Sequence, residues 1–250
     1  MILIHYFIVL ATIFSNILVL FLALKSKEKN IGLIGIGLSL TIWSTASFFN
    51  FFVINNPNIA VVLARLLNSC IILIPIFVYY LYIRLLNINA KAYWFSFKVV
   101  SILNSCLAIV SLSSSLIVSS VSPRFLIKNY TVPGVWYAVF GFIFTIEILC
   151  IHLVLYKRYK GLSYNLRTKV KYIVLTILFS IFIGLSGFIT SYFNTFFPEI
   201  GSVGASFYSI VITYVILKYR VLEIPVFISL LIGRVTTYIV YIALFIIFYI

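Results

Sequence analysis

The sequence predicts an all-α integral membrane protein, a seven-transmembrane helix bundle followed by an eighth apolar helix at the C-terminus. Hydrophobic residues make up 64% of the chain and charged residues 9%, whereas a soluble globular domain has roughly 45–50% and about 25%. The apolar runs are continuous, and about 20 such residues are enough to cross the hydrocarbon layer. A transmembrane barrel would instead alternate apolar and polar residues in segments of about ten.

Clusters of Asn, Pro, Gly and Lys interrupt the apolar runs and divide the chain into eight predicted spans. The first span has no basic leader and is too long for the apolar core of a signal peptide, so we expect it to be retained. Residues 1–224 are expected to form a seven-span region, and residues 225–250 an eighth, truncated helix. The spans lie near residues 3–24, 31–54, 60–85, 93–118, 134–157, 171–194, 199–219 and 226–250.

The basic residues predict the orientation of the chain. The chain has 18 Lys and Arg residues against 4 Asp and Glu, a formal net charge of +14. If the N-terminus is outside, most of these cations fall on one side of the membrane, and only Arg124 and Lys128 on the other. The positive-inside rule then places loops 25–30, 86–92 and 157–170 in the cytoplasm, in an inner (plasma) membrane. The basicity is expected to serve topology and the anionic lipid surface rather than nucleic acid.

A charge within a predicted span is costly and marks a candidate functional site, and Glu147 and Arg65 are the two candidates of this kind. Glu147 lies near the middle of the fifth span. It is either a buried polar contact that orients helices or part of a ligand or proton-sensing site. Arg65 lies in the outer half of the third span, and it either extends to the outer surface or pairs with a carboxylate in the bundle.

The third span has the features of a cavity wall. Pro75 removes one helical hydrogen bond and is expected to kink the helix. Asn68 lies about two turns earlier, where it contributes either to a cavity or to a helix-packing hydrogen bond. The candidate ligand-binding positions are therefore Arg65, Asn68 and Glu147.

Small residues predict where helices approach each other closely. Gly32, Gly35 and Gly37 in the second span, and Gly184 and Gly187 in the sixth, are expected to allow such contacts. The longest non-cytoplasmic connector, residues 121–134, is expected either to fold over the mouth of the bundle as a lid or to lie along the membrane surface.

The sequence lacks the residues of common catalytic sites. It has no Asp, and its four carboxylates are those of Glu28, Glu147, Glu199 and Glu223. No paired-carboxylate site, HExxH, Walker lysine loop or Gly-rich nucleotide motif occurs in it. The three cysteines have no CxxC spacing and are expected to pack as buried thiols. We therefore expect no enzyme activity, cofactor or metal in this chain.

The segment "YVILKYRVLEI", residues 214–224, resembles the end of the N-terminal seven-transmembrane region of bacterial histidine kinases, whose last helix runs into a Tyr-Ala-Ile-Leu-Arg-Tyr-Arg-Leu-Leu-Asp-Ile-like exit. The segments "LARLLNSCIILIPIFVYYLY" and "LRTKVKYIVLTILFSIFIGLSGFITSYFNTFFPEIGSV" resemble the third helix and the sixth helix with the turn into the seventh. The resemblance covers about residues 1–224. It implies a signal-exit linker that includes Tyr214, Lys218, Tyr219, Arg220 and Glu223.

The resemblance implies a membrane sensory domain without its catalytic output. A small or lipophilic ligand, or the state of the bilayer, would change packing among spans three, five, six and seven and move the exit segment. The partner would be a cytoplasmic signalling output or a second copy of the chain. The alternative is a small multi-pass transporter or channel component, in which solute flux depends on Glu147.

Overall fold

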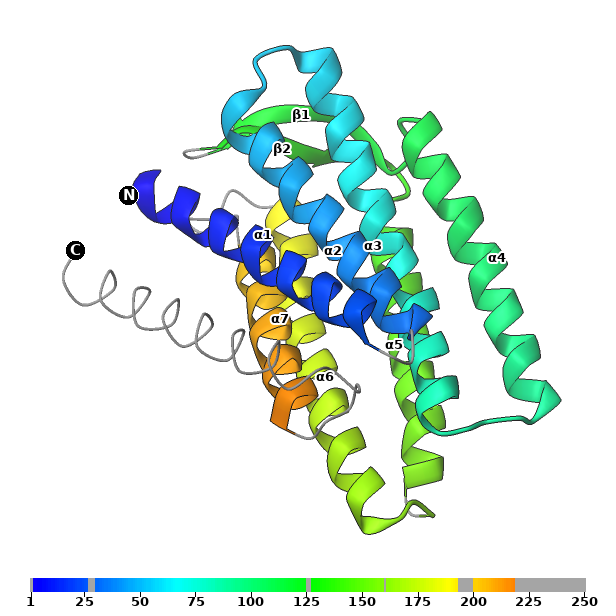
Figure 1. Ribbon diagram of the computed structural model, residues 1–250. Coiled ribbons are helices and arrows are strands. Elements are labelled where there is room, and N and C mark those ends of the chain that lie inside the picture. The colour runs from blue at the N-terminus through cyan, green and yellow to red at the C-terminus, as the bar shows by residue number, and fades with distance from the viewer. Residues whose placement is uncertain (1, 27–29, 125–126, 160, 193–199, 219–250) are drawn as a thin grey trace.

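The computed structural model describes residues 2–26, 30–124, 127–159, 161–192 and 200–218, and in this part the chain is a mainly helical, membrane-embedded protein (Figure 1). Six of the described helices are long and apolar enough to cross a membrane. Residues 201–216 form a further, shorter apolar helix. The predicted eighth span, 226–250, lies outside the described residues.

Seven α-helices follow one another along the chain, with a β-hairpin between the fourth and the fifth. The helices are α1 (Ile2–Lys25), α2 (Ile31–Phe48), α3 (Pro57–Leu85), α4 (Lys91–Ser113), α5 (Tyr137–Tyr159), α6 (Tyr164–Tyr192) and α7 (Ile200–Lys218).

The connections between helices use short capping signals. Asn30 caps α2 by accepting a hydrogen bond from the backbone N–H of Leu33 at 3.2 Å. Asn56 caps α3 in the same way, through the N–H of Asn58 at 3.0 Å, and Pro57 occupies the first turn. Proline suits that position because the N–H it lacks would have no partner inside the helix. The predicted breaks at these Asn and Pro residues are confirmed.

Two predicted boundaries are wrong. The fourth span was expected to run to residue 118, but α4 ends at Ser113 and residues 118–124 form a strand. The sixth was expected to begin at residue 171, whereas α6 begins at Tyr164. The run of cations that marked a loop therefore lies partly within the first turns of a helix.

The connector between α4 and α5 contains a β-hairpin. Strand β1 (Val118–Arg124) pairs antiparallel with β2 (Ile127–Pro133), and bulges interrupt the register near Ser119 and Pro123. The hairpin packs on α3, on α6 and on the π-helical turn η1 (Phe49–Val53) that continues α2. It is therefore packed against the end of the bundle through both strands.

Side-chain bonds hold the hairpin in place. Asn50 of η1 donates to the carbonyl of Asn129 at 3.3 Å, and Asn129 donates back to the carbonyl of Asn50 at 2.9 Å. Arg124 donates to the carbonyl of Thr190 near the end of α6 at 2.7 Å, where a cation also suits the helix dipole. The hydroxyls of Tyr130 and Thr190 are 2.8 Å apart.

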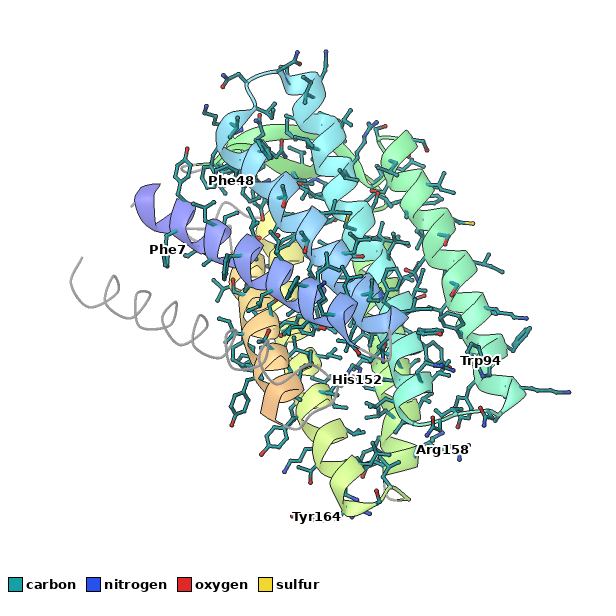
Figure 2. The ribbon with its side chains drawn as sticks, in the orientation of Figure 1. Phe7, Phe48, Trp94, His152, Arg158 and Tyr164 are labelled. Atoms are coloured by element: carbon teal, nitrogen blue, oxygen red, sulfur yellow. The ribbon has the colours of Figure 1, made fainter. Side chains whose placement is uncertain are left out.

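The helices form a bundle in which successive connectors alternate between its two ends (Figure 1). The hairpin is at one end, and the connectors that follow α3 and α5 are at the other. Figure 2 shows Arg158 and Tyr164 at the end opposite Phe48. α1 packs on α2 and α7, α3 packs on α2 and α4, and α6 packs on α7 and α5.

The bundle presents apolar side chains on its outside, as a membrane-embedded protein does. On α4, for example, Phe95, Ile102 and Ile109 are exposed, and on α5 Phe142 and Leu153. The expectation of three buried thiols is wrong for two of them: Cys70 is buried, but the other two, Cys106 and Cys150, are exposed.

Candidate functional site

A pocket that is partly open to the outside lies between the helices of the bundle, and we refer to it as the cavity. It has two adjoining chambers of about 110 Å³ and about 90 Å³. Their walls come from α2, α3, α5, α6 and α7, and the second chamber is also lined by η1 and β2. The two chambers share five wall residues, which are Trp43, Ile71, Gly184, Phe188 and Gly201.

The larger chamber is almost entirely apolar. Its lining includes Ile36 and Leu40 of α2, Ile74 of α3, Phe144 of α5 and Ile177 of α6. Apolar cavities of this size stay dry in proteins and bind small apolar molecules. We name it the apolar chamber.

The second chamber lies beneath the hairpin and is more polar. Ser47 and Asn68 line it from α2 and α3, Tyr130 and Thr131 from β2, and Ser191 from α6. We name it the polar chamber. Strand β2 of the hairpin therefore forms part of the cavity wall. Residues 125 and 126, in the apolar part of this connector that was expected to act as a lid or to lie along the membrane surface, fall outside the described residues, so that expectation stays a prediction.

Two hydroxyls in the cavity walls have no hydrogen-bond partner among the described residues. Ser47, which is fully buried, lines the polar chamber, and Tyr208, which is 4% exposed, lines the apolar chamber. A buried polar group without a partner costs roughly 1–3 kcal/mol. Both hydroxyl oxygens are enclosed by the wall, so each could bond to a bound molecule only if its side chain turned toward the chamber.

The amide of Asn68 makes one bond and leaves its oxygen available. Its Nδ2 donates to the carbonyl of Ala64 at 2.9 Å, one turn back in α3. Within the described ranges no donor bonds to its Oδ1. Pro75, one turn after Ile71, has no N–H to donate to the carbonyl of Ile71, and Ile71 lines both chambers.

Glycines in α6 leave the cavity open. A Cβ at Gly184 or Gly187 would meet no atom of the described residues within 4 Å. The expectation that these two glycines allow close helix contact is therefore wrong. The same expectation is confirmed for α2, because a Cβ at Gly32 would lie 2.7 Å from the backbone N of Leu81, and one at Gly37 would lie 3.1 Å from the Cα of Leu20.

Of the three predicted ligand positions, only Asn68 lines the cavity. Glu147 is buried, and the amide of Asn104 lies 2.9 Å from its Oε1 and 2.8 Å from its Oε2. Glu147 therefore has a helix-joining contact, which is one of the two interpretations of this residue. Arg65 is half-buried, and neither chamber includes it. Ligand binding at these positions stays a prediction.

The predicted kink and exit residues fall in two different helices. Pro75 is buried within α3, which continues through it from Pro57 to Leu85. Tyr214 is exposed on α7, and α7 ends at Lys218. The other predicted exit residues, Tyr219, Arg220 and Glu223, lie outside the described residues.

A second polar contact joins α3 and α5 near the cavity. His152 Nδ1 lies 2.7 Å from the carbonyl of Ile148, and a carbonyl can only accept. In the neutral ring Nδ1 therefore carries the proton, and Nε2 accepts from the hydroxyl of Tyr82 at 3.1 Å. This bond explains why a histidine is stable in the span without acting as a ligand.

The wall residues that the sequence analysis missed include Trp43, Ser47 and Tyr208. Serine and tyrosine are frequent in this chain's spans, and nothing in the sequence distinguishes a hydroxyl with a partner from one without. Trp43 lies in the middle of α2, away from the membrane interface that tryptophan favours. This unusual position could have identified Trp43 as a candidate site residue.

The chain was also compared with known proteins. No protein-family model matches it, and no curated protein is similar to it at a significant level.

Proposed function

We propose that this chain is a membrane sensory domain in which the occupancy of the central cavity sets the position of α7. The observation that carries the proposal is that α7 forms one wall of the cavity and also leads to the exit segment. Gly201, Ala205 and Tyr208 of α7 face the chambers, and the helix ends at Lys218. A molecule in the cavity would contact the helix that leaves the bundle.

The packing of α7 supports this proposal. α7 packs mainly on α1 and α6, whereas the cavity separates much of it from α2 and α3. Helices that border a cavity have fewer contacts to break when they shift. The occupant would thus bias α7 between two positions, which is how a ligand shifts a conformational equilibrium.

The wider topology is part of the same proposal. Seven crossings with the N-terminus outside would bring the C-terminal end of α7 to the cytoplasmic surface of the inner membrane. The resemblance of residues 214–224 to the exit of the seven-transmembrane region of bacterial histidine kinases supports a signalling output there, in a downstream domain or a partner protein. The chain itself would sense and transmit rather than catalyse.

The test uses the full chain in membrane vesicles, with its three cysteines replaced and a single new cysteine at position 218. The measurement is the rate at which a maleimide labels that cysteine. Filling the cavity with Gly184→Leu should change the rate by about fivefold, the lower end of typical allosteric coupling. Phe182→Leu, on the exposed side of the same helix, should leave it unchanged.

Two outcomes count against the proposal. Equal labelling rates in the open and the filled protein would separate the cavity from the exit. Flux of a solute through the chain in proteoliposomes, lost in Glu147→Gln, would instead identify the transporter that the sequence left open.

A further inference from the structure

We infer that the cavity takes a small, uncharged molecule with an apolar body and a hydroxyl, carbonyl or amide group that forms hydrogen bonds. This inference rests on the proposed function for its role as a stimulus. The binding itself depends only on the cavity. The size of the cavity, the chemistry of its walls and its unpartnered polar groups each define part of the ligand.

The size of the cavity sets the size of the ligand. The chambers measure about 110 Å³ and about 90 Å³ and share part of their walls. Benzene occupies an engineered protein cavity of about 150 Å³, so the two partly open chambers together accommodate a molecule of one or two aromatic rings. A phospholipid or a peptide is too large for this space.

The walls exclude a charged ligand. Neither chamber is lined by a Lys, Arg, His, Asp or Glu residue within the part of the chain that the structure describes. Glu147, the only described carboxylate of a side chain, is held by Asn104 outside the lining. An ion moved into such a site without a counter-charge loses far more hydration energy than the walls return.

The polar groups define the rest of the ligand. The Oδ1 atom of Asn68, which lines the polar chamber, has no donor among the described residues and can only accept. The hydroxyls of Ser47 and Tyr208 also lack partners there, but they are enclosed by the wall and would have to turn to reach the ligand. A ligand hydroxyl in the polar chamber would therefore donate to Asn68, while the body of the ligand fills the apolar chamber.

The apolar chamber meets the polar chamber at Gly184, where a side chain would obstruct both. The open space at this glycine has a cost, since glycine within a helix is about 0.5–1 kcal/mol less stable than alanine. Contact between a bound molecule and this position would explain why a glycine stands here despite its cost to the stability of the helix. Trp43, which also borders both chambers, would lie against the same molecule.

Naphthol is a suitable probe, because it has about the required size, is uncharged at neutral pH and carries one hydroxyl. Saturable binding of radiolabelled naphthol is measured on the full chain in nanodiscs. Naphthalene and naphthoate are added as competitors of naphthol. Both resemble naphthol in shape, but naphthalene lacks the polar group and naphthoate carries a negative charge. Nanodiscs of the same lipid without protein give the background from partition into lipid.

We expect saturable naphthol binding to the natural chain, and loss of it in Gly184→Leu and in Gly187→Val. Naphthalene should bind about fivefold more weakly, as expected for the loss of a hydrogen bond to buried groups. Naphthoate should bind at least about tenfold more weakly than naphthol. Asn68→Leu should remove most of the advantage of naphthol over naphthalene, because it removes the oxygen that accepts from the ligand hydroxyl.

Three results would overturn the inference: naphthoate competing as well as naphthol, saturable binding that survives in both filled variants, or no saturable binding to folded natural chain. The last would indicate a cavity occupied by water or left empty. Cooperative thermal unfolding of each variant shows that it is folded, and Gly187→Val replaces Gly184→Leu if the latter is not.

The labelling rate at position 218 separates this inference from the proposed sensory function. If naphthol binds but the rate does not change, the ligand class stands and the sensory function fails. If the filled variants change the rate but naphthol does not bind, the sensory function stands and the ligand class is wrong.

Discussion

Asn104 of α4 and Glu147 of α5 form a buried pair in which the amide nitrogen lies within 2.9 Å of both carboxyl oxygens. α4 otherwise packs mainly on α3. Both residues are nearly inaccessible to solvent, and in the hydrocarbon region a polar group without a partner is costly. The pair therefore fixes the position of α4 against α5.

Replacement of one partner should destabilise the bundle, and replacement of both should restore much of the loss. Asn104→Leu leaves the carboxyl buried without its partner, so the free energy of unfolding should fall by about 1–3 kcal/mol. Asn104→Leu combined with Glu147→Leu should recover most of it. The measurement is the midpoint of unfolding in SDS. Ser113→Ala is the control, because among the described residues the hydroxyl of Ser113 bonds only within α4. If the losses of stability from the two single changes simply added in the double variant, the two residues would not be coupled.

Two glycine-to-alanine changes should have opposite effects on stability. A Cβ at Gly32 would lie 2.7 Å from the backbone of Leu81, which must shift, so Gly32→Ala should cost about 1–3 kcal/mol. A Cβ at Gly184 meets open space, so Gly184→Ala should stabilise α6 by about 0.5–1 kcal/mol. Thermal unfolding in detergent measures both. Destabilisation by both changes would argue against the cavity.

Asn16 joins three helices and should be important for the placement of α7. It is fully buried, and it donates to the carbonyl of Leu40 at 3.0 Å and to the hydroxyl of Ser44 at 3.2 Å, while Ser209 of α7 donates to its oxygen. Asn16→Ala should lower the free energy of unfolding by about 1–3 kcal/mol. It should also alter the labelling rate at position 218.

Ser15→Ala is the matched control for this change, because the hydroxyl of Ser15 bonds only to the carbonyl of Thr12 in its own helix. Its effect on stability should be within about 0.5 kcal/mol. If the two variants behaved alike, the contact between α1 and α7 would not hold the exit helix.

The all-helical membrane class and much of the placement of the apolar helices could be predicted from the sequence, because about 20 apolar residues between polar breaks is a strong signal. The predicted number of spans stays a prediction, since six of the described helices are long and apolar enough to cross a membrane. The hairpin was missed, since residues 114–134 contain serines and apolar residues in no clear alternation. Pairing of β1 with β2 depends on bonds to η1 and α6, such as that between Asn129 and Asn50, which no local pattern reveals.

The candidate site could be predicted only in part. A search for charges in the membrane found Glu147, Arg65 and the amide of Asn68, but only Asn68 lines the cavity. The open space of the cavity depends on the lack of a side chain at Gly184 and Gly187. The hydroxyls of Ser47 and Tyr208 in its walls have no hydrogen-bond partner among the described residues. Both properties arise from packing between distant segments.

The most direct test of the account measures maleimide labelling of a cysteine at position 218 while naphthol is added to the full chain. The account predicts that saturating naphthol changes the labelling rate in the open protein and leaves it unchanged in Gly184→Leu, where the cavity is filled. An equal change in both proteins, or no change in an open protein that binds naphthol, would contradict it.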